Sequence, residues 1–455
     1  MNATSNKAIR IGAGLSVLAA LLAFAARVAS AQESGPRRLS LGEAARLAAS
    51  QTAAVQEAAL RVSEANARVK QSRSSLLPQV DLTPSWTSHT VNSASFGFNF
   101  PAPAGEKPLL DPNGQIIGPV RFWDFRGGVS QTLINPAGSQ RVRAARAGVT
   151  AASADVATAG ENAASNAALS YLRALRSEAV YRARVADSTL AVDLLNVARN
   201  QLEAGVGVGL DVTRAQSQSA GARAQLIQAR NDRDRAQLDL KRALNLPLDQ
   251  QIILTDSLTA AVVVDTTEAA AVAQAVQHRP DIRAAEAQLE AAEQQVAATR
   301  ATRLPTVNAF ANTGPTGFVN HLLNTYTYGL QLSWPVFEGG RREAETEEQI
   351  AMAKEIDVRR RDLQQQATVD VRAALLDIAS TREQVEAART RQSLAELEVQ
   401  QARDRFNAGV AGNADVITAS VTLNAARTGL IDALASYQAA RVSLAKAEGT
   451  VSQLR

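Results

Sequence analysis

The sequence predicts a mainly helical fold with an internal duplication, in which each half contains one β-hairpin. Ala-rich segments with apolar residues at helical spacing end at prolines, in Leu77-Pro78 and Leu304-Pro305, because proline lacks an N–H group and clashes with the preceding turn. After the second junction, the even positions from Tyr326 to Val336 are apolar or aromatic, and the odd ones are Thr, Gly, Gln, Ser and Pro. This alternation predicts a strand with one apolar and one polar face.

The duplication is visible in two separate alignments of the chain with itself. A shift of 227 residues lays VKQSRSSLLPQV (69–80) on VAATRATRLPTV (296–307), and a shift of 204 lays LEAGVGVGLDV (202–212) on FNAGVAGNADV (406–416). Agreement at a helix–strand junction and again at a Gly-rich turn predicts two copies of one helix, hairpin, helix unit.

The first 31 residues predict an export signal. Lys7 and Arg10 precede an apolar run, and Ala29-Ser30-Ala31 provides the small residues of a cleavage site. An uncleaved membrane anchor is the alternative, although the run is short for a span of about 20 residues. We therefore expect five parts: a signal peptide (1–31), a first repeat (32–245), an equatorial linker (246–267), a second repeat (268–449) and a C-terminal tail (450–455).

Aromatic residues are rare, at 4% of the chain, and they gather in the predicted strand segments. All three Trp, two of five Tyr and eight of ten Phe lie within 79–134 and 306–337. This distribution favours membrane strands with interfacial aromatic girdles, and a soluble pair of hairpins packed on helices is the alternative. The residues assigned to the girdle are Trp86, Trp123, Tyr326, Tyr328 and Trp334.

Four strands are predicted, at about 79–91, 121–134, 306–313 and 325–337. An open sheet edge cannot lie in lipid because its backbone groups would be unpaired, so copies of the chain must associate if these strands cross a membrane. The smallest closed membrane barrels have about eight strands, which leaves two or three copies possible. Turn-rich segments at 97–119 and 314–320 predict loops at the same, external end.

Two helices, at about 138–203 and 341–407, each run roughly 66 residues, which is about 100 Å. Shorter helices stacked end to end match one long helix, and this predicts a rod with the N-terminal segment, the linker and the C-terminus at mid-height. The last short helix has apolar residues seven apart, which predicts coiled-coil packing, and a free-standing dimeric coiled coil is the alternative. The short helices are predicted at 41–76, 212–245, 268–303 and 416–449, and the seven-residue series is Val416, Leu423, Leu430, Tyr437 and Leu444.

Several motifs together resemble the TolC family of outer-membrane efflux proteins over about residues 39–449. They are the LLP and RLP junctions, WPVFEGG (334–340), HRPDI (278–282) followed by Ala285-Glu286, and the paired AGV turns. The resemblance implies a homotrimer in which three chains form one 12-stranded antiparallel outer-membrane β-barrel, four strands per chain, continued by a coiled-coil-like periplasmic α-barrel. It implies a passive exit duct for efflux or type I secretion, joined through a periplasmic adaptor (membrane fusion) protein to an inner-membrane pump such as an RND or ABC transporter.

The resemblance also assigns the periplasmic gate and the adaptor contact to the two tip turns. Glycine permits the tight reversal there, and Asp211 and Asp415 are predicted as N-caps of the returning helices, with an acidic ring at the constriction as a second role for Asp415. The family's second acidic position holds Thr418, and its latch positions hold Phe406 and Ala411, so the closed state must be held differently or less tightly. The predicted tip residues are Ala204, Gly205, Val206, Ala408, Gly409 and Val410.

The sequence offers no enzymatic site. The chain has no cysteine, and its histidines at 89, 278 and 321 lack the spacing of a metal motif. Its 48 basic residues interleave with 44 acidic ones, which is typical of solvated helix faces and not of nucleic-acid binding. We expect no catalytic residue, cofactor or metal, and outer-membrane lipid as a contact. The exported substrate, the cognate pump and the latch stay open, and a helical scaffold without a pore is the alternative function.

Overall fold

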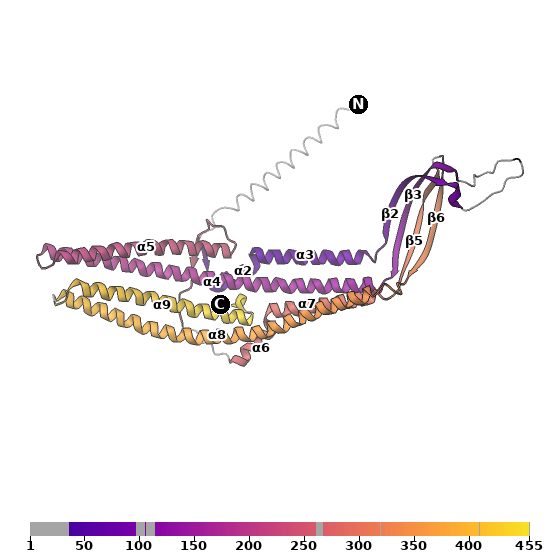
Figure 1. Cartoon of the computed structure of the whole chain (residues 1–455). Coiled ribbons are helices and arrows are strands. Elements are labelled where there is room, and N and C mark those ends of the chain that lie inside the picture. Colours follow the sequence, from indigo (N-terminus) through magenta and orange to yellow (C-terminus); the bar gives the residue numbers. More distant parts are fainter. Residues whose placement is uncertain are drawn as a thin grey trace, which may run out of the picture. The chain divides into compact units, whose positions relative to one another are not determined.

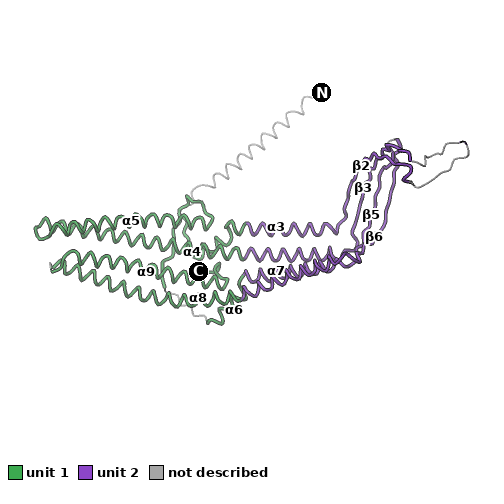
Figure 2. The backbone as a smooth tube through the Cα atoms, in the orientation of Figure 1, with its two compact units in different colours: residues 1–56, 158–279, 365–455 green, residues 57–157, 280–364 purple. Residues whose placement is uncertain are grey.

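The computed structural model describes residues 36–96, 105, 114–260, 267–318, 320–408 and 410–454 (Figure 1). The predicted signal peptide, Gly409 and residues 261–266 of the predicted linker lie outside the described residues. The chain divides into two compact units, with residues 1–56, 158–279 and 365–455 in unit 1 and residues 57–157 and 280–364 in unit 2 (Figure 2). Three helices, α3 (Ala53–Ser74), α4 (Pro136–Glu203) and α8 (Arg341–Asn407), contribute residues to both units.

Unit 2 contains the strands, together with the helices that lead into and out of them. Its elements besides parts of α4 and α8 are most of α3 (Ala53–Ser74), β2 (Gln79–Asn92), the 3₁₀ turn η1 (Ser93–Phe96), β3 (Ile116–Ile134), α7 (Pro280–Ala301), β5 (Thr306–Phe318) and β6 (His321–Ser333). The four strands form one antiparallel sheet in the order β2-β3-β5-β6. Each predicted hairpin is therefore present, and the two hairpins pair through β3 and β5.

The strand boundaries differ from the prediction in three places. The predicted loop at 314–320 is mostly strand, because Gly314 and Gly317 adopt positive φ angles of 149° and 148° that keep both residues in the ladder. The strand predicted to reach 337 ends at Ser333, shortly before Pro335, which has no N–H group to donate. Residues 116–119 of the other predicted loop begin β3, and most of the rest of that loop lies outside the described residues.

Unit 1 contains β1 (Arg37–Leu39), α2 (Leu41–Gln51), α5 (Gly209–Ala243), β4 (Ile252–Leu254), α6 (Glu268–His278), α9 (Asn413–Glu448) and the 3₁₀ turn η2 (Val451–Gln453), with the remaining parts of α3, α4 and α8. The sequence did not predict β1 and β4, which pair in parallel. Tyr171 ties this pair to α4, because its buried hydroxyl donates to the Leu39 carbonyl at 2.9 Å and accepts from the Asp256 N–H at 3.3 Å. Burial raises the pKa of Tyr171 to about 12.

Two of the predicted short helices are each broken into two. The helix predicted at 41–76 divides at Thr52, whose backbone is extended and whose hydroxyl donates to the Ala48 carbonyl. The helix predicted at 268–303 divides at Arg279, because the residue before a proline is disfavoured in the helical conformation and Pro280 begins α7. The other four helices lie within a few residues of their predicted bounds.

The core of unit 1 is built largely from alanine, which lets helix backbones approach closely. One cluster joins Ala45 of α2, Ala164, Ala168 and Leu172 of α4, Val442 and Ala445 of α9, and Val451 of η2. Another joins Ala395 and Val399 of α8 to Ala419, Leu423 and Ala426 of α9. Four members of the predicted seven-residue series are buried and Leu430 is half-buried, so the predicted packing face of α9 is confirmed.

Among the helices of the described chain, none combines the length and the apolar character that a membrane-spanning helix requires.

Candidate functional site

The first tip turn connects α4 to α5 through residues 204–208. Gly205 has a φ of 76°, in the left-handed region that residues other than glycine rarely adopt. The N–H groups of Val206 and Gly207 both donate to the Gln201 carbonyl, at 3.0 and 2.9 Å. These bonds satisfy the end of α4, as in the usual glycine-terminated helix ending. Val206 is left 79% exposed at the outer side of the turn.

The second tip turn, between α8 and α9, repeats this bonding pattern. The Val410 N–H donates to the Arg405 carbonyl at 3.1 Å, which is the bond from Val206 to Gln201 displaced by 204 residues. The Ala408 N–H donates to the Asp404 carbonyl at 3.0 Å, as Ala204 does to Asn200. Val410 is 70% exposed. The duplication therefore extends to individual backbone hydrogen bonds.

The predicted N-cap roles of Asp211 and Asp415 are wrong. The N-caps are Val208 for α5 and Gly412 for α9, and neither makes a side-chain capping bond. Both helices begin earlier than predicted, so each aspartate lies at the third helical position. A carboxylate in the first turn still complements the helix dipole. Asp211 also lies 3.8 Å from the Arg214 guanidinium, whereas Asp415 is exposed.

Phe406 and Thr418, at the predicted gate positions, have different surroundings. Phe406 is buried against Leu194 of α4 and Val416 of α9, so one side chain connects three helices. Thr418 is exposed, and its hydroxyl donates to the Ala414 carbonyl of its own helix at 2.9 Å. The structure thus brings Phe406 into the helix packing near the tip, while Thr418 stays on the surface.

Asn413, the first residue of α9, is a tip residue that the sequence reasoning missed. It is fully buried, and its Nδ2 donates to the Asp211 carbonyl of α5 at 3.3 Å, which connects the starts of the two returning helices. Among the described residues, its Oδ1 has no hydrogen-bond partner. Under the 204-residue shift Asn413 replaces Gly209. That departure from the repeat was the available signal.

The register of the sheet separates one apolar face from one polar face. Direct pairing of Trp86 with Trp123, and strict alternation along each strand, put these residues on one face. That apolar face carries Val80, Leu82, Pro84 and Trp86 of β2, Trp123, Phe125 and Val129 of β3, Ala309 and Ala311 of β5, and Leu322, Tyr326, Tyr328, Leu330 and Leu332 of β6. The polar face carries Asp81, Thr83, Asp124, Arg126, Asn308, Asn312, Thr325, Thr327 and Gln331.

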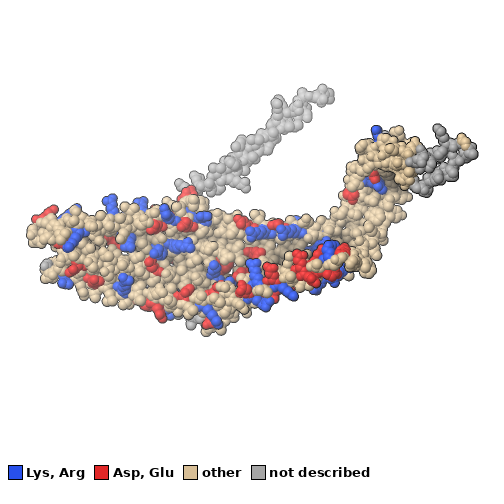
Figure 3. Space-filling model, in the orientation of Figure 1, with Lys and Arg blue, Asp and Glu red and all other residues tan. Residues whose placement is uncertain are grey.

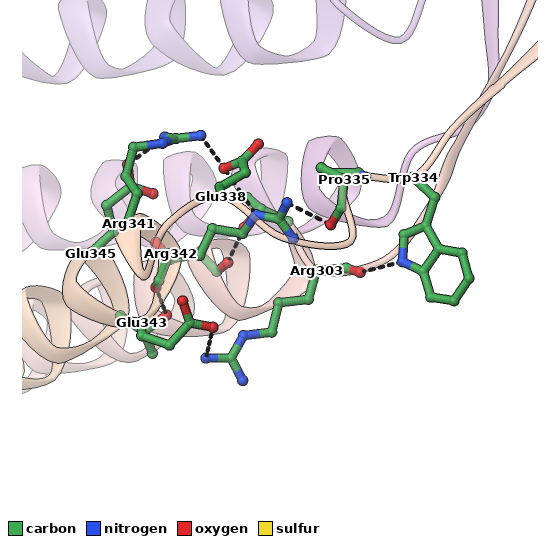
Figure 4. A network of polar contacts seen from close by, with 11 residues as sticks. Arg303, Trp334, Pro335, Glu338, Arg341, Arg342, Glu343 and Glu345 are labelled. Carbon is green, nitrogen blue, oxygen red and sulfur yellow. Dashed lines mark hydrogen bonds and ion pairs between the residues drawn. The ribbon is translucent and has the colours of Figure 1, made fainter.

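The predicted girdle residues lie at different levels of the apolar face. Trp86 and Trp123 have ring centroids 6.2 Å apart near the loop end of the sheet. Tyr326 and Tyr328 occupy rows closer to the helices and are exposed. Trp334 lies just beyond β6 at the helix end (Figure 4). On the face shown in Figure 3, charged side chains are dense over the helices and sparse over the strands.

The two helix–strand junctions share one hydrogen-bonding pattern. Leu77-Pro78 and Leu304-Pro305 separate each helix end from its strand, as predicted. The carbonyl of Leu76 accepts from the Gln131 side-chain amide at 2.8 Å, and the carbonyl at the position displaced by 227 residues, Arg303, accepts from the Trp334 indole at 3.2 Å (Figure 4). Both carbonyls lie in the turn between helix and strand, two residues beyond the helix end, and each side-chain donor satisfies a backbone acceptor that no helix or strand bond would use.

A network of ion pairs connects the segment that follows β6 to the first turns of α8 (Figure 4). Gly339 and Gly340 adopt φ angles of 63° and 82° and redirect the chain into the helix. Arg342 is buried and donates to the Pro335 carbonyl at 2.6 Å and to the Glu338 carboxylate at 3.1 Å. Such a bonded guanidinium fixes the direction in which the helix leaves the strand.

The match to a known family decides the identity of the chain. The model of a family described as outer membrane efflux protein matches residues 44–246 and 271–450. The chain belongs to the outer membrane efflux protein family. The resemblance seen in the sequence is therefore confirmed. The protein is an outer-membrane protein with a periplasmic helical part, and its family is one of efflux proteins and not of enzymes.

Curated relatives of this efflux protein include the probable efflux pump outer membrane protein TtgC and the antibiotic efflux pump outer membrane protein ArpC, both from Pseudomonas putida. Each is 27% identical over 267 residues, which is 56% of this chain. The match spans 53% of each relative, so the chain aligns with about half of their length.

Solved structures share the fold of this efflux protein. The outer-membrane channel OprN aligns with a TM-score of 0.73 at 18% identity, covering 91% of both chains. The Campylobacter jejuni CmeC outer membrane channel aligns with a TM-score of 0.73 at 17% identity, covering 90% of this chain and 85% of that one. The predicted mainly helical fold with four antiparallel strands per chain is thus confirmed.

A buried charge cluster in this efflux protein was also missed by the sequence reasoning. The Asp187 carboxylate of α4 accepts from Arg184 at 3.1 Å and from Arg427 of α9 at 3.5 Å. Arg184 donates in addition to the Thr428 hydroxyl at 3.2 Å. The side-chain amide nitrogen of Asn424 also donates to the Asp187 carboxylate. Burial raises the pKa of Asp187 although Arg184 and Arg427 act to lower it.

Within the described ranges, no three His, Cys, Asp or Glu side chains are grouped as a metal site. The three histidines lie in β2, at the end of α6 and at the start of β6.

Proposed function

We propose that this protein is an outer-membrane exit duct of a tripartite efflux system, formed by three copies of the chain. The observation that carries the proposal is the open four-stranded sheet with one apolar and one polar face. Its edge strands, β2 and β6, have unpaired outer backbone groups, which cannot remain so in lipid. Because neighbouring strands alternate in direction, β6 of one copy and β2 of the next are antiparallel, and pairing them closes a barrel.

Three copies, the number that the family resemblance implies, supply twelve strands. In that barrel the apolar face contacts outer-membrane lipid and the polar face lines a water-filled lumen. The Trp86 and Trp123 rings lie near the external surface of the outer membrane, and Trp334 lies near its periplasmic surface. The loops between paired strands then face the exterior.

The tip turns contact the periplasmic adaptor protein. Val206, Val208, Leu210 and Val410 are exposed at or beside these turns, and a group of exposed apolar side chains at the end of a polar helical unit favours a protein partner. The adaptor would connect the duct to an inner-membrane pump of the RND or ABC type. The name of the relative ArpC refers to an antibiotic efflux pump, so we propose small organic molecules as cargo and not secreted proteins.

The periplasmic gate is held shut by packing and by buried charge. Asp415 lies exposed on the first turn of α9 and is our candidate for a charged ring at the constriction. The Phe406 contacts and the Asp187 cluster both hold α9 against α4, and they take the place of the family's latch, whose positions hold Phe406 and Ala411 in this chain. Opening then requires α9 to separate from α4 near the tip.

The mass of the particle extracted in mild detergent from isolated outer membranes tests the duct. We expect three chains before heating and one chain after boiling, and the purified particle should conduct ions across a planar bilayer. A soluble monomer or dimer in the periplasmic fraction would instead support a helical scaffold without a pore.

A further inference from the structure

Apolar side chains interrupt the polar face of the sheet. Phe310 lies nearer the helices, and Val120, Phe122, Phe318 and Leu323 lie near the loop end. Phe122 of β3 lies directly opposite Phe318 of β5, and Leu323 of β6 occupies the neighbouring row. Alternation along β3 puts Phe122 on the same face as Asp124 and Arg126. This face is otherwise rich in Asp, Asn, Gln, Ser and Thr, so apolar residues on it need an explanation other than contact with lipid.

The two phenyl rings meet edge to face. Their centroids are 5.9 Å apart and their planes are inclined by 83°, which is a favourable geometry for an aromatic pair. Because Phe122 belongs to the first hairpin and Phe318 to the second, the contact supports the pairing of β3 with β5. The contact does not cover both rings completely. Phe318 remains 55% exposed, so part of its ring surface is available to a ligand.

The pair belongs to one row that crosses all four strands. Thr87 of β2 pairs with Phe122, Phe122 pairs with Phe318, and Phe318 pairs with His321 of β6. When copies of the sheet close around a common axis, such a row becomes part of a ring at one level of the lumen. Two phenyl rings from each chain then face the axis at the external outlet.

We propose that Phe122 and Phe318 form an aromatic ring inside the outlet of the duct, which narrows the lumen and contacts apolar or cationic organic cargo as it leaves. This inference depends on the proposed trimeric duct. Barrels of about eight strands are filled by their own side chains, and those of about sixteen leave an open channel, so at twelve strands the inward side chains decide the width. Phenyl rings at one level are therefore a local constriction.

The neighbouring charges do not compete with the aromatic surface for cargo. Arg126 and Asp124, in the adjacent rows of the same face, bond to each other, with Arg126 Nε 2.8 Å from Asp124 Oδ1. The pair is thus neutral as a unit and attracts neither cations nor anions strongly. The faces of phenyl rings attract organic cations and apolar molecules, so this ring selects by aromatic contact and not by net charge.

Single-channel recording of the purified full-length protein in planar bilayers tests the ring, with tetrabutylammonium added from the external side as the probe. Phe318→Ala should raise the conductance and weaken block about three- to thirty-fold, the range that a lost cation–π contact supports. Phe318→Leu keeps most of the volume and should leave conductance nearly unchanged while weakening block. The matched control is Phe125→Ala on the opposite face, where Phe125 stacks on Trp123 at 5.5 Å, and it should change neither property.

The outcomes separate the ring from the duct. If wild-type channels conduct and both Phe318 variants, assembled as trimers, keep wild-type block, the aromatic ring is overturned and the duct stands. Equal weakening of block by Phe125→Ala would also overturn it, since that side chain lies on the other face. A wild-type protein that never conducts would overturn the duct and the ring together.

Discussion

Replacing Asp187 with Ala tests whether the buried charge cluster holds α9 against α4. The carboxylate is 2% exposed, and both arginines that contact it keep part of their surface in water, 19% for Arg184 and 30% for Arg427. Removing one partner of a fully buried ion pair costs about 3–5 kcal/mol, because the charge left behind has no compensation. Partial hydration of the two guanidinium groups lowers this cost, and we expect about 2 kcal/mol, within the range for a lost hydrogen bond to a charged group.

Native-state hydrogen exchange on the detergent-solubilised protein measures this effect where it acts. A loss of about 2 kcal/mol raises the equilibrium constant for local opening roughly 30-fold, so amides of α9 around residues 424–428 should exchange faster by that factor. Asp187→Asn keeps an acceptor oxygen at the same place and should show a smaller increase.

The chain offers a matched control in a second ion pair between the same helices. Arg176 of α4 contacts Asp432 of α9 at 2.7 Å, but these side chains are 45% and 44% exposed. Exposed pairs contribute less than about 1 kcal/mol, so Asp432→Ala should change α9 exchange little. Equal acceleration by Asp187→Ala and Asp432→Ala would refute the argument, because burial would then not distinguish the two pairs.

Four further predictions follow from the geometry. Burial raises the pKa of Asp187 above its usual value of 3.8, so the folded protein binds the Asp187 proton more tightly than the unfolded chain. Wild type should therefore gain stability relative to Asp187→Asn as pH falls, and it should lose that gain as pH rises through the raised pKa. Thermal melting of both proteins across the acidic range measures the difference. Leu330→Arg, which lies deeper in the lipid face than Leu332, should impair membrane assembly, since a lipid-facing charge costs up to about 2–4 kcal/mol at the bilayer midplane. Gln331→Arg on the opposite face should assemble, as heat-sensitive trimers on gels would report. Gly205→Ala should destabilise the first tip turn by about 1–2 kcal/mol because φ is positive there, with faster exchange of the first amides of α5 as the measure. Asp415→Ala should reduce the cation preference of reconstituted channels, and unchanged selectivity would leave Asp415 with only its helix-dipole role.

Most of the fold could be predicted because its signals are local. Prolines mark the helix–strand junctions, alternation marks the strands, and the self-alignment predicts two similar halves. The errors arise where a local signal was weak or was read too strictly. Glycines at 314 and 317 suggested a loop, yet they occupy extended backbone within the ladder. Pro280 restricts the backbone of Arg279 and so breaks the helix that was predicted as continuous over 268–303.

The candidate site was less predictable because its residues are distant in the sequence. Asp187 and Arg427 come from different repeats, and nothing near either one predicts that they meet. A charged residue on a long helix is usually solvated, and only the packing of α9 on α4 makes Asp187 buried. The tip turns could be predicted because glycine has a specific backbone use there, whereas their aspartates were misplaced because Ncap and third-position carboxylates both fit a helix start.

The two repeats differ in what covers their returning helices. In a single chain, fourteen residues of α9 are buried and only four of α5. The apolar side chains of Leu210, Ile227 and Leu238 on α5 are exposed instead. Exposed apolar side chains gain stability when a partner covers them, and in the proposed trimer the neighbouring copy is available to supply that partner. The second repeat has larger residues at two tip positions, with Phe406 in place of Leu202 and Asn413 in place of Gly209. These residues hold α9 against helices of its own chain, whereas in the proposed trimer α5 packs against the neighbouring chain.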